Sequence, residues 1–345
     1  MIEEINPTKS HMKKFIVVLF CIAVAVVCRA DGPYHFIRDI PIPGEGGWDY
    51  MSIDPLTHWL YVSHGTEVVV IDLTANQIIG AITNTPGVHG VALAFELGKG
   101  VASDGRSNTA GIVDLATLQT ITNLPTAEGP DGFVYNPKEK EAYLFCGRAN
   151  AATVVDVPGQ RIVATIPLDG RPEFAAVDPE ADKVYDNLED KSEVTVIDAK
   201  AHQVITNWAI APGQSASGMA IDVSGHRLFI GCHNQKMLMM NDDDGTVVTS
   251  VPIGNGVDAD AFDPGTHYAF ASCGDGTTTI AKESNDTLTV VQALKTESGA
   301  RTMALDPGTH NIYLATAKFT PPDPGQRRGR MIPGTFKIIE YGMGQ

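Results

Sequence analysis

Short apolar runs recur along the chain, and each is bounded by Gly, Pro, Asp or Asn, the residues that favour tight turns. Apolar residues in these runs alternate with polar ones or follow one another directly, and β-branched residues are frequent, so β-strands are predicted. The first unit has four such runs between positions 48 and 82: WDYMSI, HWLYVS, EVVVID and QIIGAI. Later units repeat this order, so each unit is predicted to form one four-stranded antiparallel sheet.

The first run of each unit ends in Asp-Pro or a related pair, and these pairs mark a regular period. They begin at Asp54, Ala94, Asn136, Asp178, Asp222, Asp263 and Asp306, so successive pairs are 40, 42, 42, 44, 41 and 43 residues apart. Small four-stranded sheets bury their faces only by stacking on neighbours, and this period is typical of a β-propeller rather than a helical solenoid. The seven units predict an all-β, seven-bladed β-propeller.

The last unit ends one strand short, after MALDP, IYLATA and TFKIIEY. Residues 35–43, HFIRDIPIP, resemble the fourth strands of other units, such as IVATIPL. An N-terminal strand that completes blade 7 would close the ring and leave no open sheet edge. We therefore expect residues 35–43 to be the fourth strand of that blade.

The segment before the repeats has the layout of a secretory signal. Two lysines precede the apolar run 15–27, which is too short to cross a bilayer. Residues 1–30 are predicted to be a cleavable signal peptide, with translation starting at Met1 or Met12, and residues 31–345 to be the mature propeller, without a transmembrane segment. A periplasmic or secreted protein is expected.

The chain is acidic, with 41 Asp and Glu against 25 Lys and Arg and a formal net charge of −16. Such a surface repels phosphate groups, so nucleic acid and anionic membranes are poor partners. Cys146, Cys232 and Cys273 follow the predicted signal, and they occupy the same position in three different units. This odd set predicts buried free thiols rather than a disulfide framework.

The sequence LYVSHG followed by EVVVIDL resembles the YVTN repeat, and residues 34–341 as a whole resemble the YncE-like family of YVTN propellers. This resemblance implies a seven-bladed ring. It implies no single activity, because related propellers serve as surface proteins, binding modules and enzyme domains. One relative is associated with single-stranded DNA, a role that the acidic composition of this chain argues against.

Candidate functional residues come from the repeat itself. The residue five positions before each pair begins the innermost strand and is expected to rim the central channel, at Asp49, His89, Asp131, Glu173, Ser217, Asp258 and Arg301. Trp48 lies beside the first of these. Loops between second and third strands should open on the same face and add His64, Asp104, Arg106, Arg148, Glu189, His233, Asp275 and Lys318. The aspartates of the Asp-Pro pairs lie at the opposite end and are interpreted as turn formers.

Several chemistries fit this predicted channel mouth. Calcium would suit the carboxylates, and a transition metal would also use His89 with His64 or His233, which makes the candidate metal ligands Asp49, His89, Asp131, Glu173 and Asp258. Without a metal, a carboxylate or His89 could act as a base while Arg301 stabilises an anion. The same charges could also line a hydrated opening with no ligand.

No His-Glu-x-x-His motif, P-loop or nucleophile elbow is present. The sequence therefore favours a non-enzymatic scaffold that binds a small ligand or protein partner at the channel face. No cofactor beyond a divalent cation is indicated. The alternative, by analogy of fold, is a metal-dependent hydrolase, lactonase or lyase.

One segment departs from the repeat. FTPPDPGQRRGRMIPG, at 319–334, interrupts blade 7, and its prolines make it stiff. Arg327, Arg328 and Arg330 concentrate basic charge there. It is expected to rise over the same face as the channel mouth, either as a solvated loop or as an arm that docks an anionic ligand or partner.

Overall fold

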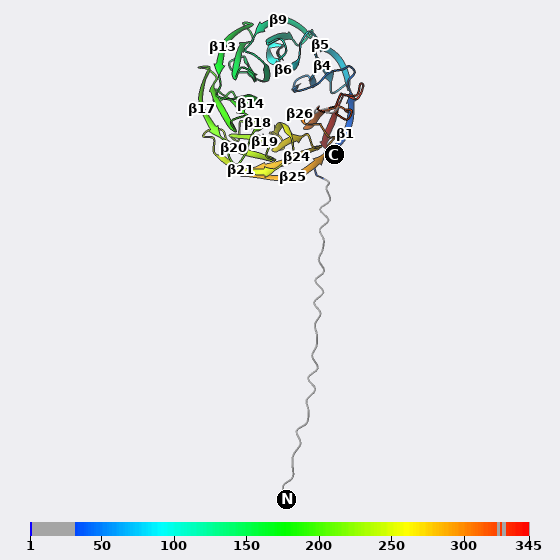
Figure 1. The fold of residues 1–345 in the computed structure, drawn as a ribbon, viewed down its shortest axis with the longest axis vertical. Coiled ribbons are helices and arrows are strands. Elements are labelled where there is room, and N and C mark those ends of the chain that lie inside the picture. Colours follow the sequence, from blue (N-terminus) through cyan, green and yellow to red (C-terminus); the bar gives the residue numbers. More distant parts are fainter. Residues whose placement is uncertain (2–31, 323–324, 326–328, 345) are drawn as a thin grey trace. The chain divides into compact units, whose positions relative to one another are not determined.

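The computed structural model describes residues 1, 32–322, 325 and 329–344. Apart from Met1, the predicted signal peptide lies outside these residues, as do Arg327 and Arg328. The described residues form 28 strands in seven four-stranded antiparallel sheets, with one 3-10 turn at Phe95–Leu97 (Figure 1). The prediction of an all-β, seven-bladed β-propeller is confirmed.

Each blade runs outward from its innermost strand. Blades 1 to 4 consist of β2 (Met51–Asp54), β3 (Trp59–His64), β4 (Glu67–Asp72) and β5 (Gln77–Ile82); β6 (Val88–Ala94), β7 (Lys99–Asp104), β8 (Thr109–Asp114) and β9 (Gln119–Pro125); β10 (Pro130–Asn136), β11 (Glu141–Cys146), β12 (Ala151–Asp156) and β13 (Arg161–Pro167); β14 (Pro172–Asp178), β15 (Lys183–Leu188), β16 (Glu193–Asp198) and β17 (Gln203–Ala209). Blades 5 to 7 consist of β18 (Ala216–Asp222), β19 (Arg227–Cys232), β20 (Lys236–Asn241) and β21 (Val247–Pro252); β22 (Val257–Asp263), β23 (Tyr268–Cys273), β24 (Thr277–Ser284) and β25 (Thr287–Lys295); β26 (Thr302–Asp306), β27 (Asn311–Thr316), β28 (Lys337–Met343) and β1 (Tyr34–Pro41).

The blades form a closed ring, and the colours of Figure 1 follow the sequence once around it. Every innermost strand contacts the innermost strands of both neighbouring blades, including β26 of the last blade with β2 of the first. Second and third strands are buried on both faces between blades, whereas the fourth strands alternate between exposed and half-buried positions. In the part of the chain that the structure describes, no helix is long and apolar enough to span a bilayer.

The N-terminal strand completes the last blade, as predicted. β1 pairs antiparallel with β28, with Tyr34 opposite Met343 and Pro41 opposite Lys337. The buried Tyr34 ring packs edge-on against Phe270 of blade 6, and its hydroxyl donates to the His310 carbonyl at 2.6 Å. The first and last strands of the propeller, β1 and β28, are therefore neighbours within one sheet (Figure 1).

The aspartates of the Asp-Pro pairs form turns, as their sequence context predicts. Asp54 accepts a hydrogen bond from the Leu56 amide at 2.9 Å, and Asp178 accepts two from Glu180 and Ala181. Such Asx turns fix the chain as it leaves the innermost strand. These residues lie at the end of the innermost strands opposite to the predicted channel mouth.

The Tyr50 ring contacts two aromatic rings contributed by other blades. Tyr50 is buried and lies 4.4 Å from Phe174 and 5.3 Å from Phe133, measured between ring centroids. Beyond them is a mainly apolar pocket of about 450 Å³, lined by side chains such as Ile53 and Val134. The polar end of the channel is thus separated from an apolar end.

Candidate functional site

The seven residues predicted to rim the channel, here called the rim residues, occupy equivalent places. His89, Asp131, Glu173, Ser217 and Asp258 are each the second residue of an innermost strand, and Asp49 and Arg301 lie just before theirs. In five of the seven blades, the residue two positions before the rim residue is glycine. Its φ is 65° at Gly87 and 73° at Gly129, a left-handed conformation that turns the chain sharply into the strand.

Buried polar side chains of the second strands hold the rim backbone across blade boundaries. The Ser103 hydroxyl donates to the Asp131 carbonyl at 2.8 Å, and the Asn187 amide donates to the Ser217 carbonyl at 2.8 Å. The Asp49 amide donates to Ser63 Oγ at 2.8 Å within blade 1. Hydrogen bonds from second strands therefore help to fix the backbone of these rim residues.

A pocket of about 590 Å³ lies over blades 1 to 4, and we call it the rim pocket. It brings together Asp49, His89, Asp131 and Glu173 with Trp48. Its remaining lining is Gly47, Gly65, Gly87, Val88, Gly105, Arg106, Gly129, Gly147, Arg148, Arg171 and Pro172. The many glycines leave the pocket wide and its backbone accessible.

A second pocket of about 300 Å³, the inner pocket, adjoins the first and shares Asp49, Asp131, Arg171 and Glu173 with it. It adds the remaining rim residues Ser217, Asp258 and Arg301, together with Glu189 and His233, and the aromatic side chains of Tyr50 and Phe174. The two pockets together collect all seven rim residues.

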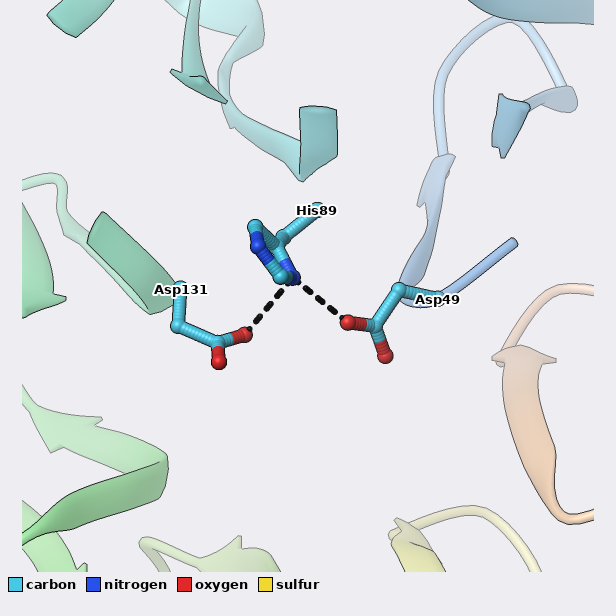
Figure 2. Close-up of side chains that lie close together, drawn as sticks. All are labelled: Asp49, His89 and Asp131. Atoms are coloured by element: carbon cyan, nitrogen blue, oxygen red, sulfur yellow. Dashed lines mark hydrogen bonds and ion pairs between the residues drawn. The ribbon is translucent and has the colours of Figure 1, made fainter. Parts of the chain in front are cut away.

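Asp49, His89 and Asp131 meet directly, although they come from three neighbouring blades (Figure 2). The His89 Nδ1–H donates to Asp49 Oδ2 at 2.6 Å and lies 3.0 Å from Asp131 Oδ1. One imidazole nitrogen is therefore shared by two carboxylates. All three side chains remain about one-third exposed, at 30 to 35%.

This arrangement sets the charge of the cluster. Burial alone would lower the pKa of His89, but its hydrogen bonds and charge interactions with Asp131 and Asp49 outweigh burial and raise the pKa to about 10. Burial raises the pKa of Asp49 to about 6, against the opposing effect of its hydrogen bond to His89. At neutral pH the cluster is an imidazolium held between carboxylates.

The inner pocket holds further paired charges. Burial, followed by the charges of Asp131, Glu189 and Asp258, raises the pKa of Glu173 to about 8, so this carboxyl is mostly protonated at neutral pH. Glu189 forms ion pairs with Arg171 and, at 3.3 Å, with His233. The hydrogen bond to His233 lowers the pKa of Glu189 and raises that of His233.

Arg301 lies 3.4 Å from Asp258, measured between Nη1 and Oδ1. Three arginines line the rim pocket and differ in their partners. Arg148 pairs with Glu128 at 3.2 Å, and Arg171 pairs with Glu189. The Arg106 side chain is exposed and forms no ion pair within the described residues.

Some predicted site residues lie outside both pockets, among them His64 and Lys318. His64 is 2% exposed and stacks on Phe336 at 4.6 Å, because its position on the second strand faces the neighbouring blade rather than the opening. Burial lowers the pKa of His64, so a neutral packing residue is favoured. Lys318 is exposed at the foot of the 319–334 segment and lines neither pocket.

Trp48 lines the rim pocket and also packs against the 319–334 segment. Its ring stacks on Phe336 at 5.0 Å and lies 6.0 Å from Phe319, which pairs with Met331 in a β-bridge. This aromatic stack fixes the base of the segment beside the rim pocket. Arg330 lies in the described part of this segment and is exposed.

Asp104 and Asp275 lie outside both pockets as well. Asp104 is buried between blades, and burial raises its pKa to about 7. Asp275 accepts a hydrogen bond from the Asn255 amide at 2.7 Å. The thiols of Cys146, Cys232 and Cys273 are free and buried, which confirms the expectation of packing cysteines.

Within the described residues of the pockets, Asp49, His89 and Asp131 form a group that could hold a metal ion, since their ligand atoms lie within 4.8 Å of one another. Of the other candidate ligands, Glu173 lines both pockets and Asp258 lines the inner one. The shared Nδ1–H bond lengths are those of hydrogen bonds. A metal at this place would have to displace that proton.

Sequence reasoning missed two features of the site. Arg171 takes the place that glycine holds in five other blades, and this departure from the repeat is the signal that could have identified it. The contact of Tyr50 with Phe133 and Phe174 joins blades 1, 3 and 4, and no local pattern predicts such a contact.

Comparison with known proteins identifies the fold. No protein-family model matches the chain, and no curated protein matches it by sequence. Among solved structures, a chain of Kuenenia stuttgartiensis hydrazine synthase superposes with a TM-score of 0.70 at 17% identity and covers 81% of this chain and 96% of its own. U3-55K gives a TM-score of 0.74 at 9% identity, covering 88% of this chain and 98% of its own.

A chain of the mitotic checkpoint complex gives a TM-score of 0.73 at 14% identity, covering 91% of this chain and 95% of its own. At these identities the similarity is one of architecture, namely the β-propeller.

Proposed function

We propose that this protein is an exported, YncE-like binding protein and that its rim pocket binds a small carboxylate that also carries a hydroxyl or amino group. The observation that carries this proposal is the Arg106 guanidinium, which lines the rim pocket without an ion-pair partner among the described residues. A guanidinium offers two parallel N–H donors, which match the two oxygens of a carboxylate.

The neighbouring groups complement such a ligand. His89 uses Nδ1 for Asp49 and Asp131, which leaves Nε2–H available as a further donor in the same pocket. The pKa of Glu173 is raised to about 8 by burial, so its protonated carboxyl can also donate. The second oxygens of Asp49 and Asp131 point away from His89 and can accept from a hydroxyl or ammonium group (Figure 2).

Calorimetric titration of the full chain with small hydroxy and amino acids, and with their neutral amides, tests this proposal. A charged hydrogen bond contributes about 1.5–3 kcal/mol, so Arg106→Ala should weaken carboxylate binding by roughly 10-fold or more. Arg161→Ala is the matched control, because Arg161 is exposed and forms an ion pair with Asp156 away from the pocket. Equal affinity of the two variants for the carboxylates, or equal binding of acids and amides by the wild type, would refute the proposal.

A metal-dependent hydrolase, lactonase or lyase is the second candidate, and the Asp49, His89 and Asp131 group favours it. Imidazole nitrogen and carboxylate oxygen are both zinc ligands, and catalytic zinc sites have three protein ligands and an open fourth position. A bound divalent ion there could activate a water molecule. This candidate predicts a bound metal that Asp131→Asn removes together with turnover, whereas the carboxylate-binding proposal predicts that carboxylate affinity survives chelation.

A further inference from the structure

Histidines recur at the end of the propeller opposite to the rim pocket. Four of them, at His58, His226, His267 and His310, occupy the same place in blades 1, 5, 6 and 7, directly before the second strand. All four have a left-handed backbone, with φ between 54° and 62°. Each lies where its imidazole can meet the Asp-Pro aspartate of the preceding blade.

Two of these junctions are closed by a direct hydrogen bond. His58 Nδ1 lies 2.8 Å from Asp306 Oδ2 across the boundary of blades 7 and 1, and His310 Nδ1 lies 2.8 Å from Asp263 Oδ2 across the boundary of blades 6 and 7. Both aspartate side chains are at most 1% exposed. In these two junctions the imidazole forms a hydrogen bond with the buried carboxylate, so the carboxylate needs no additional cation or donor.

The junction of blades 4 and 5 is different. His226 Nδ1 approaches Asp242 Oδ1 of its own blade at 3.3 Å, and the Asp178 side chain of the preceding blade accepts only backbone amides. Ligand atoms of these three residues nevertheless lie within 4.8 Å of one another. The Asp242 side chain is 1% exposed, and its Oδ2 atom has no hydrogen-bond partner among the residues that the structure describes.

The electrostatics of this junction also differ. Burial raises the pKa of Asp242; His226 opposes that rise, and the charges of Asp243 and Asp178 add to it. Asp243 Oδ2 lies 3.9 Å from His226 Nδ1 and is largely exposed. Three carboxylates around one imidazole leave excess negative charge, and a buried carboxylate oxygen without a donor is costly unless a cation or a proton occupies the space.

The contact between His226 and Asp242 is a long hydrogen bond, and its spacing also fits a metal site. Two ligands that lie about 2.0–2.1 Å from a tetrahedral zinc ion are about 3.3 Å apart. The distance from His226 Nδ1 to Asp242 Oδ1 has this value, whereas the closed junctions have the 2.8 Å typical of a hydrogen bond. The half-exposed imidazole leaves room for a water ligand.

We propose that Asp178, His226 and Asp242 form a binding site for a divalent transition metal of the zinc type, which joins blade 4 to blade 5. One imidazole and carboxylate oxygens are ligands that zinc accepts, and the set is too poor in oxygen ligands to suit calcium. The site is separate from the rim pocket, so it requires neither the carboxylate ligand nor the enzyme alternative.

The next junction, with Asp222, His267 and Glu283, has a related arrangement. No buried side-chain oxygen of these three described residues lacks a partner, and Asp222 also accepts from Ser224 Oγ at 2.8 Å. The proposal therefore concerns the junction of blades 4 and 5 alone.

Metal analysis of the full chain tests the site. Chelator-treated protein is dialysed against zinc chloride and its zinc content is measured for wild type, His226→Gln and Asp242→Asn. His310→Gln is the matched control, because His310 has the same place in blade 7 but is closed onto Asp263. We expect the two site variants to bind about one zinc ion per chain fewer than wild type and the control to bind as much as wild type.

Cobalt(II) in place of zinc gives a second readout, because a tetrahedral cobalt site absorbs visible light strongly. This absorption should appear in wild type and in His310→Gln and be absent from Asp242→Asn, with circular dichroism showing that every variant is folded. The proposal fails if wild type binds no zinc, if both site variants keep it, or if His310→Gln loses as much. It fails equally if Asp49→Asn alone abolishes binding, because the ion would then lie in the rim pocket.

Discussion

Closure of the ring by β1 predicts that a single buried side chain near the N-terminus stabilises the whole propeller. Tyr34 is 2% exposed, and its ring packs edge-on against Phe270 and Tyr268 of blade 6. Its hydroxyl donates to the His310 carbonyl of blade 7 at 2.6 Å. Tyr34→Ala removes all of these contacts, and Tyr34→Phe removes only the hydrogen bond.

The expected magnitudes follow from these contacts. An aromatic side chain that buries about 200 Å² gains about 5 kcal/mol at about 25 cal/mol/Å², and truncations of core aromatics to alanine cost about 3–5 kcal/mol. We therefore expect Tyr34→Ala to lower the free energy of unfolding by about 4 kcal/mol. Tyr34→Phe should cost about 1 kcal/mol, the net contribution of one hydrogen bond.

Urea unfolding followed by tryptophan fluorescence measures these changes. Phe36→Ala is the control, because Phe36 lies in the same strand but is 55% exposed, and it should cost less than about 1 kcal/mol. If Tyr34→Ala unfolded at the same urea concentration as wild type, β1 would not contribute to the stability of the ring. A cost for Phe36→Ala as large as that for Tyr34→Ala would contradict the assigned register of the strand.

Three further predictions concern titratable groups. The pKa of His89 in the folded state is about 10, above its ordinary value of 6.5. The protonated imidazole therefore stabilises the fold fully below pH 6.5, and this stabilisation is lost as the pH rises through 10. The difference in unfolding free energy between wild type and His89→Gln should shrink over that range. The pKa of Glu173 is raised from 4.5 to about 8, so wild type should lose stability relative to Glu173→Gln as the pH rises from 4.5 through 8. A difference in unfolding free energy that did not change with pH would contradict the buried, protonated carboxyl. Burial raises the pKa of Cys232 and Cys273 to about 12 and also raises that of Cys146, so these thiols should react with a disulfide reagent only after unfolding, as peptide mass spectrometry can show.

The repeat made most of the fold predictable, because blade geometry is encoded locally. Alternating and continuous apolar runs, Asp-Pro turns and a constant period are sufficient to number the blades and to pair β1 with the last one. The rim residues followed from the same frame, since equivalent positions in equivalent sheets point the same way. The second unit shows how robust the frame is, because Ala94 and Phe95 replace Asp-Pro with a short 3-10 turn and keep the spacing.

Side-chain direction and contacts between blades were less predictable. His64 has a polar side chain at a loop edge, yet its position on the second strand turns it toward Phe336 and away from solvent. The sharing of His89 between Asp49 and Asp131 depends on distances between blades that the sequence does not state. The contacts of Tyr50 depend on the same distances, because its ring meets rings contributed by blades 3 and 4.

A crystal structure of the full chain soaked with the tightest-binding hydroxy or amino acid tests whether the rim pocket is a carboxylate-binding site. We predict density for the ligand in the rim pocket, with its carboxylate paired to the Arg106 guanidinium and its hydroxyl or amino group near Asp49 and Asp131. Density for water alone at this position, or for the ligand elsewhere on the propeller, would contradict carboxylate binding in the rim pocket.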